Sequence, residues 1–510
     1  MKQGPGIEWR NLALPLASLA IAAVIVFHGA LGFFFSQDDF GWMARARGLI
    51  DRTPGPWRFL SLRLYWDLMR PLGMNALAYH LVSLAAHVAA TWLLFDLLRR
   101  RVSVTAAWLG AVFFAVHPAL YTALYWASAI GDVWALLFVL ATLRVIDGSG
   151  RWRWLAVPLF AGALMSKESV LLLPLWIGLA TRKGWRRALD PLVLSLVAVA
   201  AIHFATLYFQ NISGLGSGGS EPSAYALKFD RTPWLNLLTY VGWTVNFLYA
   251  TVSSVSDGVD PSVFMAGGVA MALWLVGLAW RRLRQTGWLE GGLLYAALLL
   301  PVLPLGNHTY HYYLYAPLAG AAWCLAAAFD GVLVRPSARA SAKRSARGSK
   351  TESRPSQFPV GVAAVVGALL VWNGALLVRK VESFPFLVPE LRADPIVDRA
   401  RIARNVYDGL RTETLPAHAR LIFWSPQAIA LQRQGGRDTT MESYFEKNVR
   451  GALYEGIGVR VMAPAVDSVE FVRAFHPADS SSRYVLYRVD GRITLFEPAV
   501  VESALRSGPP

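Results

Sequence analysis

Residues 12–39 read LALPLASLAIAAVIVFHGALGFFFSQDD, an apolar run that ends in two adjacent acids, Asp38 and Asp39. The run of about 24 residues is long enough to cross a membrane and longer than the apolar part of a signal peptide. Because no small-residue cleavage pattern follows it, we expect a retained anchor. Acids at the point where a span leaves the membrane suggest function. The competing interpretation is a pair of solvated acids at the interface.

The composition extends this reading to the whole chain. Of its 510 residues, 55% are hydrophobic and only 16% are charged, which is typical of a polytopic membrane protein. The net charge of +16 would suit nucleic acid, but the basic residues cluster between apolar segments, as in cytoplasmic loops. We therefore expect no nucleic-acid partner. The clusters are Arg99 to Arg101, Arg144 with Arg151 and Arg153, Arg182 to Arg187, Arg281 to Arg284, and 335–354.

The apolar segments predict a helical bundle of about eleven spans, with the amino terminus inside and the carboxyl terminus outside. The segment 154–180 has basic flanks, so we expect two short helices with the tip Ser166-Lys167-Glu168-Ser169 outside; a single kinked helix is the alternative. Residues 235–254 fit a re-entrant segment, because a further span would reverse the charge pattern. The expected spans are 12–35, 76–98, 103–120, 129–146, two within 154–180, 191–209, 262–280, 289–305, 313–334 and 358–378.

We expect two domains, a membrane domain of residues 1–380 and a second domain of residues 390–510. Two loops of the first domain, and the second domain as a whole, depart from the membrane pattern. The outer loop 36–75 carries Trp57 and Trp66 and suggests amphipathic helices on the membrane surface. The loop 335–357 is basic and should lie in the cytoplasm, near membrane lipids. The second domain suggests a small α/β fold outside the membrane. Its expected strands are 421–424, 459–462, 484–489 and 493–496.

Ionisable residues recur in the expected outer loops, while the span interiors have few. After Asp38 and Asp39 come Asp132, then Lys167 with Glu168, then a loop with His308 and His311. A transporter usually places its acids near the membrane midplane, so this asymmetry favours an active site at the outer interface.

Several motifs containing these residues resemble those of the GT-C superfamily of membrane glycosyltransferases, most closely the protein O-mannosyltransferase and TMTC branch (glycosyltransferase family 39). The similarity covers roughly residues 10 to 330, and LMSKES is its most specific element. The chain departs from the family pattern at Thr122, Ile130 and His311-Tyr312. The motifs are the acidic pair, RPLGMN (70–75), YHLVSLAAH (79–87), FAVHP (114–118), WASAIGD (126–132), LMSKES (164–169) and YLYAP (313–317).

The resemblance implies transfer of a sugar from a polyprenyl-phosphate donor to an acceptor hydroxyl, with inversion. Such a reaction needs a base for the hydroxyl proton, for which we expect Asp38 or Asp39. It also needs cations for the leaving phosphate. Lys167 is the first candidate, followed by His80, Arg58 and Arg63. The expected substrate-binding residues are Asp132, Glu168, His117, His311 and Tyr313.

Each assignment has a structural alternative. Lys167 and Glu168 could form a local ion pair, and His80 with His87 could serve helix packing. Asp132 could cap a helix, and the tyrosines near Tyr313 could belong to an interfacial aromatic belt. Two adjacent carboxylates could instead hold a divalent metal such as Mg²⁺ or Mn²⁺, so metal dependence is open.

The sequence thus predicts a membrane glycosyltransferase of GT-C type whose acceptor is a glycan, a lipid or a protein. We expect a bacterial inner membrane protein with its site and second domain in the periplasm; the superfamily also occurs in the endoplasmic reticulum. The alternatives are a transporter or flippase, a polymerase or ligase of lipid-linked glycans, and a non-catalytic scaffold. The single cysteine, Cys324, leaves the redox compartment undetermined.

Overall fold

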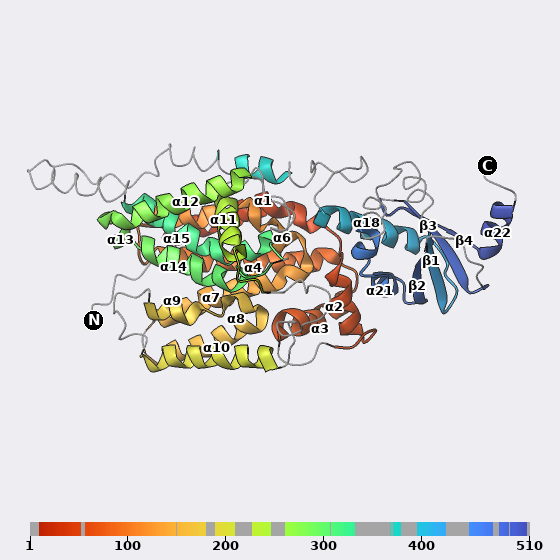
Figure 1. The fold of residues 1–510 in the computed structure, drawn as a ribbon, viewed down its shortest axis with the longest axis horizontal. Coiled ribbons are helices and arrows are strands. Elements are labelled where there is room, and N and C mark those ends of the chain that lie inside the picture. Colours follow the sequence, from red (N-terminus) through yellow and green to blue (C-terminus); the bar gives the residue numbers. More distant parts are fainter. Residues whose placement is uncertain are drawn as a thin grey trace, which may run out of the picture.

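In the computed structural model, a bundle of helices lies beside a small domain with a β-sheet (Figure 1). The structure describes residues 10–52, 57–148, 150–179, 189–209, 227–245, 261–306, 308–331, 368, 371–378, 395–424, 448–472, 479–488 and 490–506. The predicted loop 335–357, the basic residues 182–187, most of the predicted span 358–378 and the end of the predicted re-entrant segment lie outside these ranges.

The bundle is built from fifteen labelled helices within the described residues, joined by short 3₁₀ and π segments. They are α1 (Arg10–Phe27), α2 (Asp38–Arg47), α3 (Tyr65–Met69), α4 (Ala76–Leu98), α5 (Val104–Ala115), α6 (Tyr121–Tyr125), α7 (Ile130–Ile146), α8 (Ala156–Ser166), α9 (Leu173–Leu179), α10 (Pro191–Phe209), α11 (Thr232–Val245), α12 (Pro261–Ala279), α13 (Arg281–Thr286), α14 (Trp288–Leu299) and α15 (Pro317–Phe329).

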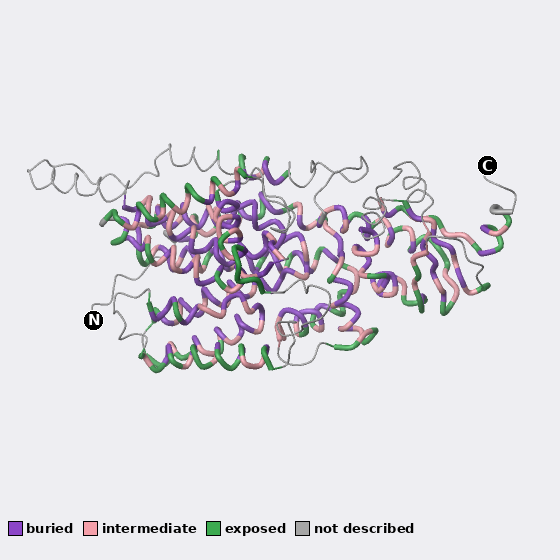
Figure 2. Tube along the Cα trace, viewed as in Figure 1, coloured by how far each residue is buried: buried purple, intermediate pink, exposed green. Residues whose placement is uncertain are grey.

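Five of these helical segments are long and apolar enough to cross a membrane, or six if the bent pair of α5 with α6 counts as one span. They are Leu12–Gly32, Ala76–Leu98, Ala127–Ile146, Pro191–Phe209 and Pro261–Ala279. Large apolar side chains on α10 and α12 stay exposed, among them Phe204 and Met265, and Figure 2 shows exposed residues along both helices. Such surfaces are unfavourable in water, so these are the helices of a membrane protein. Eleven spans remain a prediction.

The segment 154–180 forms two short helices, α8 and α9, with Lys167 at the break between them. Lys167 meets Asp132 at the start of α7, whereas Trp176 of α9 packs against Trp323 of α15. Trp323 in turn lies under the guanidinium of Arg101, near the end of α4. The chain therefore turns back at Lys167, as the two-helix prediction requires.

The predicted arginine clusters and the acidic pair lie at opposite ends of the bundle. Several of the predicted cytoplasmic arginines gather at one end, where Arg99, Arg100 and Arg144 all pair with Asp96, and Arg101 pairs with Asp147. The acid-bearing helix α2 lies at the other end, beside the sheet domain (Figure 1). Which end faces the cytoplasm stays a prediction.

The helices of the outer loop 36–75 form as predicted, but parts of them are buried in protein. Tyr65 and Trp66 are each only 1% exposed, because both pack on Tyr79 of α4. Trp66 therefore belongs to the core of the bundle rather than to a membrane surface.

The second domain has a four-stranded sheet in the order β2-β1-β3-β4. β1 is parallel to β2 and β3, and β3 is antiparallel to β4. The helix α22 packs against one face of the sheet, and the other face joins the core that continues into the bundle. The elements are α18 (Pro395–Arg411), β1 (Ala419–Trp424), α21 (Ile457–Met462), β2 (Val466–Val472), β3 (Ser482–Tyr487), β4 (Ile493–Phe496) and α22 (Pro498–Arg506).

Three predicted strands are confirmed as β1, β3 and β4, and one prediction is wrong. Residues 459–462 form the end of helix α21, and the missed strand β2 follows at Val466–Val472. Short apolar runs fit a buried helix as well as a strand. Here Gly456 has a φ of +90° and begins a helix that packs against α2, which decides the outcome.

Candidate functional site

The acidic pair opens helix α2 at an unusual backbone position. Gln37, the residue just before Asp38, has φ +57° and ψ −128°, a conformation that residues other than glycine rarely adopt. Asp38 and Asp39 then occupy the first turn, where the helix dipole favours negative charge. Gly48, with φ +74°, ends the helix in the left-handed conformation that glycine tolerates best.

Asp39 is buried and fully engaged in hydrogen bonds. The backbone amide of Ser36 donates to its Oδ2 at 3.0 Å, and the amide of Ser128 donates to its Oδ1 at 2.7 Å. The Ser128 hydroxyl donates to the same Oδ1. Burial raises the pKa of Asp39 to about 7 despite these bonds. Asp39 thus ties the end of the first span to the segment that precedes α7.

Asp38 has a different environment. Its side chain is exposed, yet the protein around it raises its pKa by desolvation. Three arginines, Arg399, Arg45 and Arg58, oppose this rise because their charges favour the ionised form. The carboxylate of Asp38 is therefore accessible to a substrate, whereas that of Asp39 is buried.

Lys167 and Asp132 form a buried ion pair. Lys167 Nζ donates to Asp132 Oδ2 at 2.6 Å, with the two side chains 6% and 4% exposed. The amino group also lies over the rings of Tyr312 and Tyr313, at 4.4 and 4.8 Å from their centroids. Such contacts with the ring faces help to stabilise a desolvated cation.

The end of α8 reaches this position because small residues allow close packing. A Cβ at Gly131 would lie only 2.8 Å from the carbonyl oxygen of Ser166. The hydroxyl of Ser61 donates to the same oxygen at 2.7 Å, from the π-helical segment Phe59–Leu64. The outer loop, α7 and α8 are therefore locked together directly beneath Lys167.

Arg58 joins the two acidic regions. Its Nε donates to Glu168 Oε2 at 2.7 Å, its second contact is with Glu168 Oε1, and its guanidinium lies over Trp57. Its charge also acts on Asp38 and on Asp132. Five residues expected to share the site, namely Asp38, Arg58, Asp132, Lys167 and Glu168, thus form one charge network. Tyr313 lies beside it.

His308 and Tyr312 belong to this neighbourhood but were not among the predicted site residues. The Tyr312 hydroxyl lies 2.7 Å from His308 Nε2. Burial lowers the pKa of His308 to about 3, with Lys167 and Arg58 contributing, so this ring is neutral at physiological pH. The aromatic-rich sequence around them was the available signal, and it also fitted an interfacial belt.

Three predicted histidines are buried in the core of the bundle. His80 Nδ1 lies 3.1 Å from the carbonyl oxygen of Leu124, and the side chain is only 1% exposed. His117 accepts from the amide of Ala119 and contacts the carbonyl of Thr244. His311 is buried with its ring 4.1 Å from that of Trp243.

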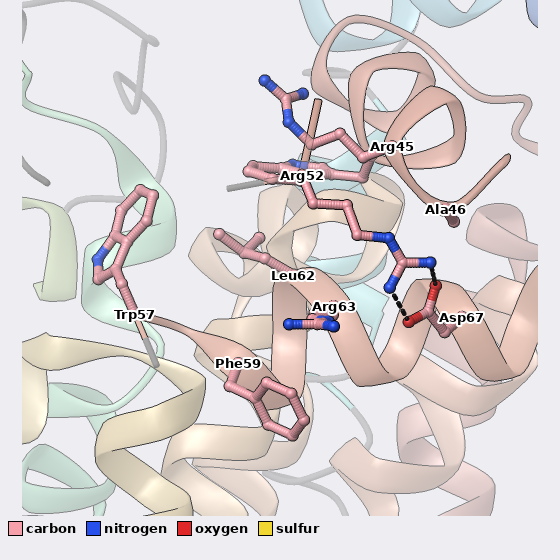
Figure 3. A pocket seen from close by; sticks show the side chains of 9 residues that line it. Arg45, Ala46, Arg52, Trp57, Phe59, Leu62, Arg63 and Asp67 are labelled. Carbon is pink, nitrogen blue, oxygen red and sulfur yellow. Dashed lines mark hydrogen bonds and ion pairs between the residues drawn. The ribbon is translucent and has the colours of Figure 1, made fainter. Parts of the chain in front are cut away.

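Arg63 lines a pocket beside the network rather than joining it. The pocket is a small surface depression between α2 and the following part of the outer loop, residues 52–67 (Figure 3). Arg52 and Asp67 form an ion pair across its edge at 3.1 Å. The lining residues are Trp42, Arg45, Ala46, Arg52, Trp57, Phe59, Leu62, Arg63 and Asp67. Arginine and aromatic side chains thus line a pocket that α2 helps to form.

Metal binding remains a hypothesis. Within the described ranges, no three His, Cys, Asp or Glu side chains come together as a metal site. Both carboxylate oxygens of Asp39 already accept hydrogen bonds, which leaves only Asp38 of the pair available as a ligand.

Comparison with known proteins adds no family to this picture, since no protein-family model and no curated protein matches the chain.

Proposed function

We propose that this protein is a membrane glycosyltransferase that moves a sugar from a polyprenyl-phosphate donor to an acceptor hydroxyl. The observation that supports this most is the convergence of Asp38, Arg58 and Lys167 at one end of an apolar bundle. Asp38 and Lys167 lie in motifs that resemble those of the GT-C superfamily, and Arg58 belongs to the outer loop 36–75. A scaffold would have no need of an exposed acid beside so many buried charges.

Asp38 is the proposed general base. Of the two acids it is the exposed one, so an acceptor hydroxyl can reach it. As the hydroxyl oxygen forms its bond to the anomeric carbon, its proton passes to Asp38, and the bond from that carbon to the phosphate oxygen breaks. Attack from the opposite side inverts the configuration. Asp39 would keep Asp38 in position through its bonds to Ser36 and Ser128.

The leaving group is a polyprenyl phosphate, which departs with its negative charge and needs cationic stabilisation. Arg58 and Lys167 are the proposed cations, and each is already paired with a carboxylate, Glu168 or Asp132. These carboxylates hold the cations in place when no phosphate is bound. Trp57, which lies under the guanidinium of Arg58, also lines the pocket with Arg63, so we place part of the lipid donor along this surface.

The acceptor, the sugar and the compartment are part of the same proposal. We propose a bacterial inner membrane location with the site and the second domain in the periplasm, and a glycan, lipid or protein as acceptor. The apolar helices support membrane location in general.

Sugar release from a panel of radiolabelled polyprenyl-phosphate sugars tests the proposal, with the purified protein in lipid nanodiscs and membrane extract as acceptor. We expect one donor to be consumed by the wild type, and Asp38→Asn to lower the rate by about 10²- to 10⁴-fold. Asp51→Asn is the matched control, because Asp51 is an exposed acid of the same outer loop.

Full activity of a correctly folded Asp38→Asn protein would contradict the base assignment. Consumption of only diphosphate-linked donors in a parallel panel would favour a polymerase or ligase. Consumption of no donor from either panel would overturn the transferase proposal.

A further inference from the structure

The second domain packs directly against α2, the helix that carries the acidic pair. A Cβ at Gly41 of α2 would lie 2.7 Å from the ring of Tyr454, and a Cβ at Gly458 would lie 2.8 Å from the ring of Phe40. Arg47, at the end of α2, donates to the carbonyl oxygen of Val461 at 2.6 Å. The domain therefore packs along the length of α2, and Gly41 and Gly458 each leave room for an aromatic ring of the opposite side.

The strained residue Gln37 is held by the same domain. Its backbone amide donates to the carbonyl oxygen of Ala452 at 3.0 Å, and its side-chain Oε1 accepts from Arg399 of α18. Arg399 is itself fixed by a 3.0 Å bond from its Nε to Asn448 Oδ1. A non-glycine residue keeps such a conformation only when its surroundings enforce it. Here the enforcing contacts come from residues more than 350 positions away in the sequence.

Arg399 also acts on the proposed base. Asp38 follows Gln37 directly, and the charged groups that act on it are Arg399 from α18, Arg45 from α2, Arg58 from the outer loop and the neighbouring Asp39. One guanidinium thus fixes the backbone that precedes Asp38 and favours the ionised form of its carboxyl group.

We propose that the second domain is a clamp for the active site, in which Arg399 is a positioning residue that holds Gln37 in its strained conformation and so directs Asp38 toward the acceptor. This inference rests on the proposed function for its effect on catalysis. Its structural part, the restraint of α2, is independent of the reaction.

Hydrogen exchange of the full-length protein in nanodiscs tests the restraint. We expect Arg399→Ala and Gln37→Ala to speed exchange in residues 38–44, because the bond that holds the start of α2 is lost. Arg411→Ala is the matched control, since Arg411 is the last residue of α18, well along the helix from Arg399, and lies over Tyr407. Unchanged exchange in both test variants would overturn the clamp, whatever the reaction proves to be.

Kinetics separate the two roles of Arg399. We expect Arg399→Ala to lower kcat by about tenfold or more, with KM for the donor nearly unchanged. It should also move the acidic limb of the pH–rate profile to higher pH, because Asp38 then ionises less readily. Arg399→Lys keeps the charge and should lower kcat without moving that limb.

Gln37→Gly provides a further comparison. Glycine adopts a positive φ without strain, so this variant should retain more activity than Gln37→Ala although both lose the Arg399 contact. Equal losses of activity in Gln37→Gly and Gln37→Ala would count against a role for the positive φ at residue 37. A normal kcat and pH profile in Arg399→Ala, in a protein that does transfer sugar, would refute the positioning role while leaving the proposed function intact.

Discussion

The two ends of the helical bundle both carry ion pairs, but they use them differently. At the end with the arginine clusters, Asp96 and Asp147 pair with arginines whose side chains are 14 to 37% exposed. At the end with the acidic pair, Lys167 and Asp132 are almost fully buried. Exposed pairs contribute little to stability, and a buried pair requires costly desolvation. The costly arrangement therefore suggests that function, rather than stability, retains these charges.

The largest effect should come from breaking the buried pair. Lys167→Ala leaves the Asp132 carboxylate buried without its cation, so we expect a loss of about 3–5 kcal/mol in the free energy of unfolding and loss of transfer. Chemical denaturation in detergent measures the first effect. Lys167→Met with Asp132→Leu should recover much of the stability but not the activity. Full recovery of transfer by that double variant would show that the pair is structural.

The Arg58–Glu168 pair should show an intermediate effect. Arg58→Lys keeps a positive charge but loses the two-pronged contact with Glu168 and the stacking on Trp57. We expect sugar transfer to fall by about tenfold to a hundredfold, with stability lowered by about 1 kcal/mol. The comparison is Arg52→Lys, which alters an exposed pair with Asp67. Equal losses in both variants would argue against a special role for Arg58.

The sequence predicted the apolar elements well because their signal is local. Helix α4 covers the predicted residues 76–98, since a long and largely apolar run leaves few alternatives in a membrane. The turn at Lys167 was also predicted from its basic flanks. The strand assigned to residues 459–462 failed because their partner is α2, more than 400 residues away in the sequence.

The candidate site was predictable only in part. Four of its charged residues followed from motifs in the outer loops, and Arg58 was a candidate because the leaving phosphate needs a cation. Their pairing did not follow, since Arg58 meets Glu168 across 110 positions. Ser128 lies within one of the motifs, but nothing marked it as the donor to Asp39. Arg399 gave no signal, because a basic residue in an amphipathic helix usually faces solvent.

The pH dependence of stability distinguishes Asp39 from the exposed acids. Its pKa is raised from an unfolded value near 3.8 to about 7, so the folded state binds more protons than the unfolded state between these values. Stability from this group is therefore present below about pH 4 and is lost as pH rises toward 7. Each pKa unit corresponds to about 1.4 kcal/mol. Denaturation of the wild type and Asp39→Asn at pH 5 and 7.5 checks this, and the variant should show a smaller change. An equal change in both proteins would assign the dependence to other groups.

The smallest effect should come from the opposite end of the bundle. Arg101 and Asp147 are 3.3 Å apart and partly solvated, at 36% and 25% exposure. Asp147→Asn should change the free energy of unfolding by less than about 1 kcal/mol, since water replaces much of what the ion pair provides. Sugar transfer should remain normal, because no described contact joins this pair to Asp38 or Lys167. A large loss of transfer would mean that charge at both ends serves the reaction. The contrast between the two ends would then reflect solvation alone.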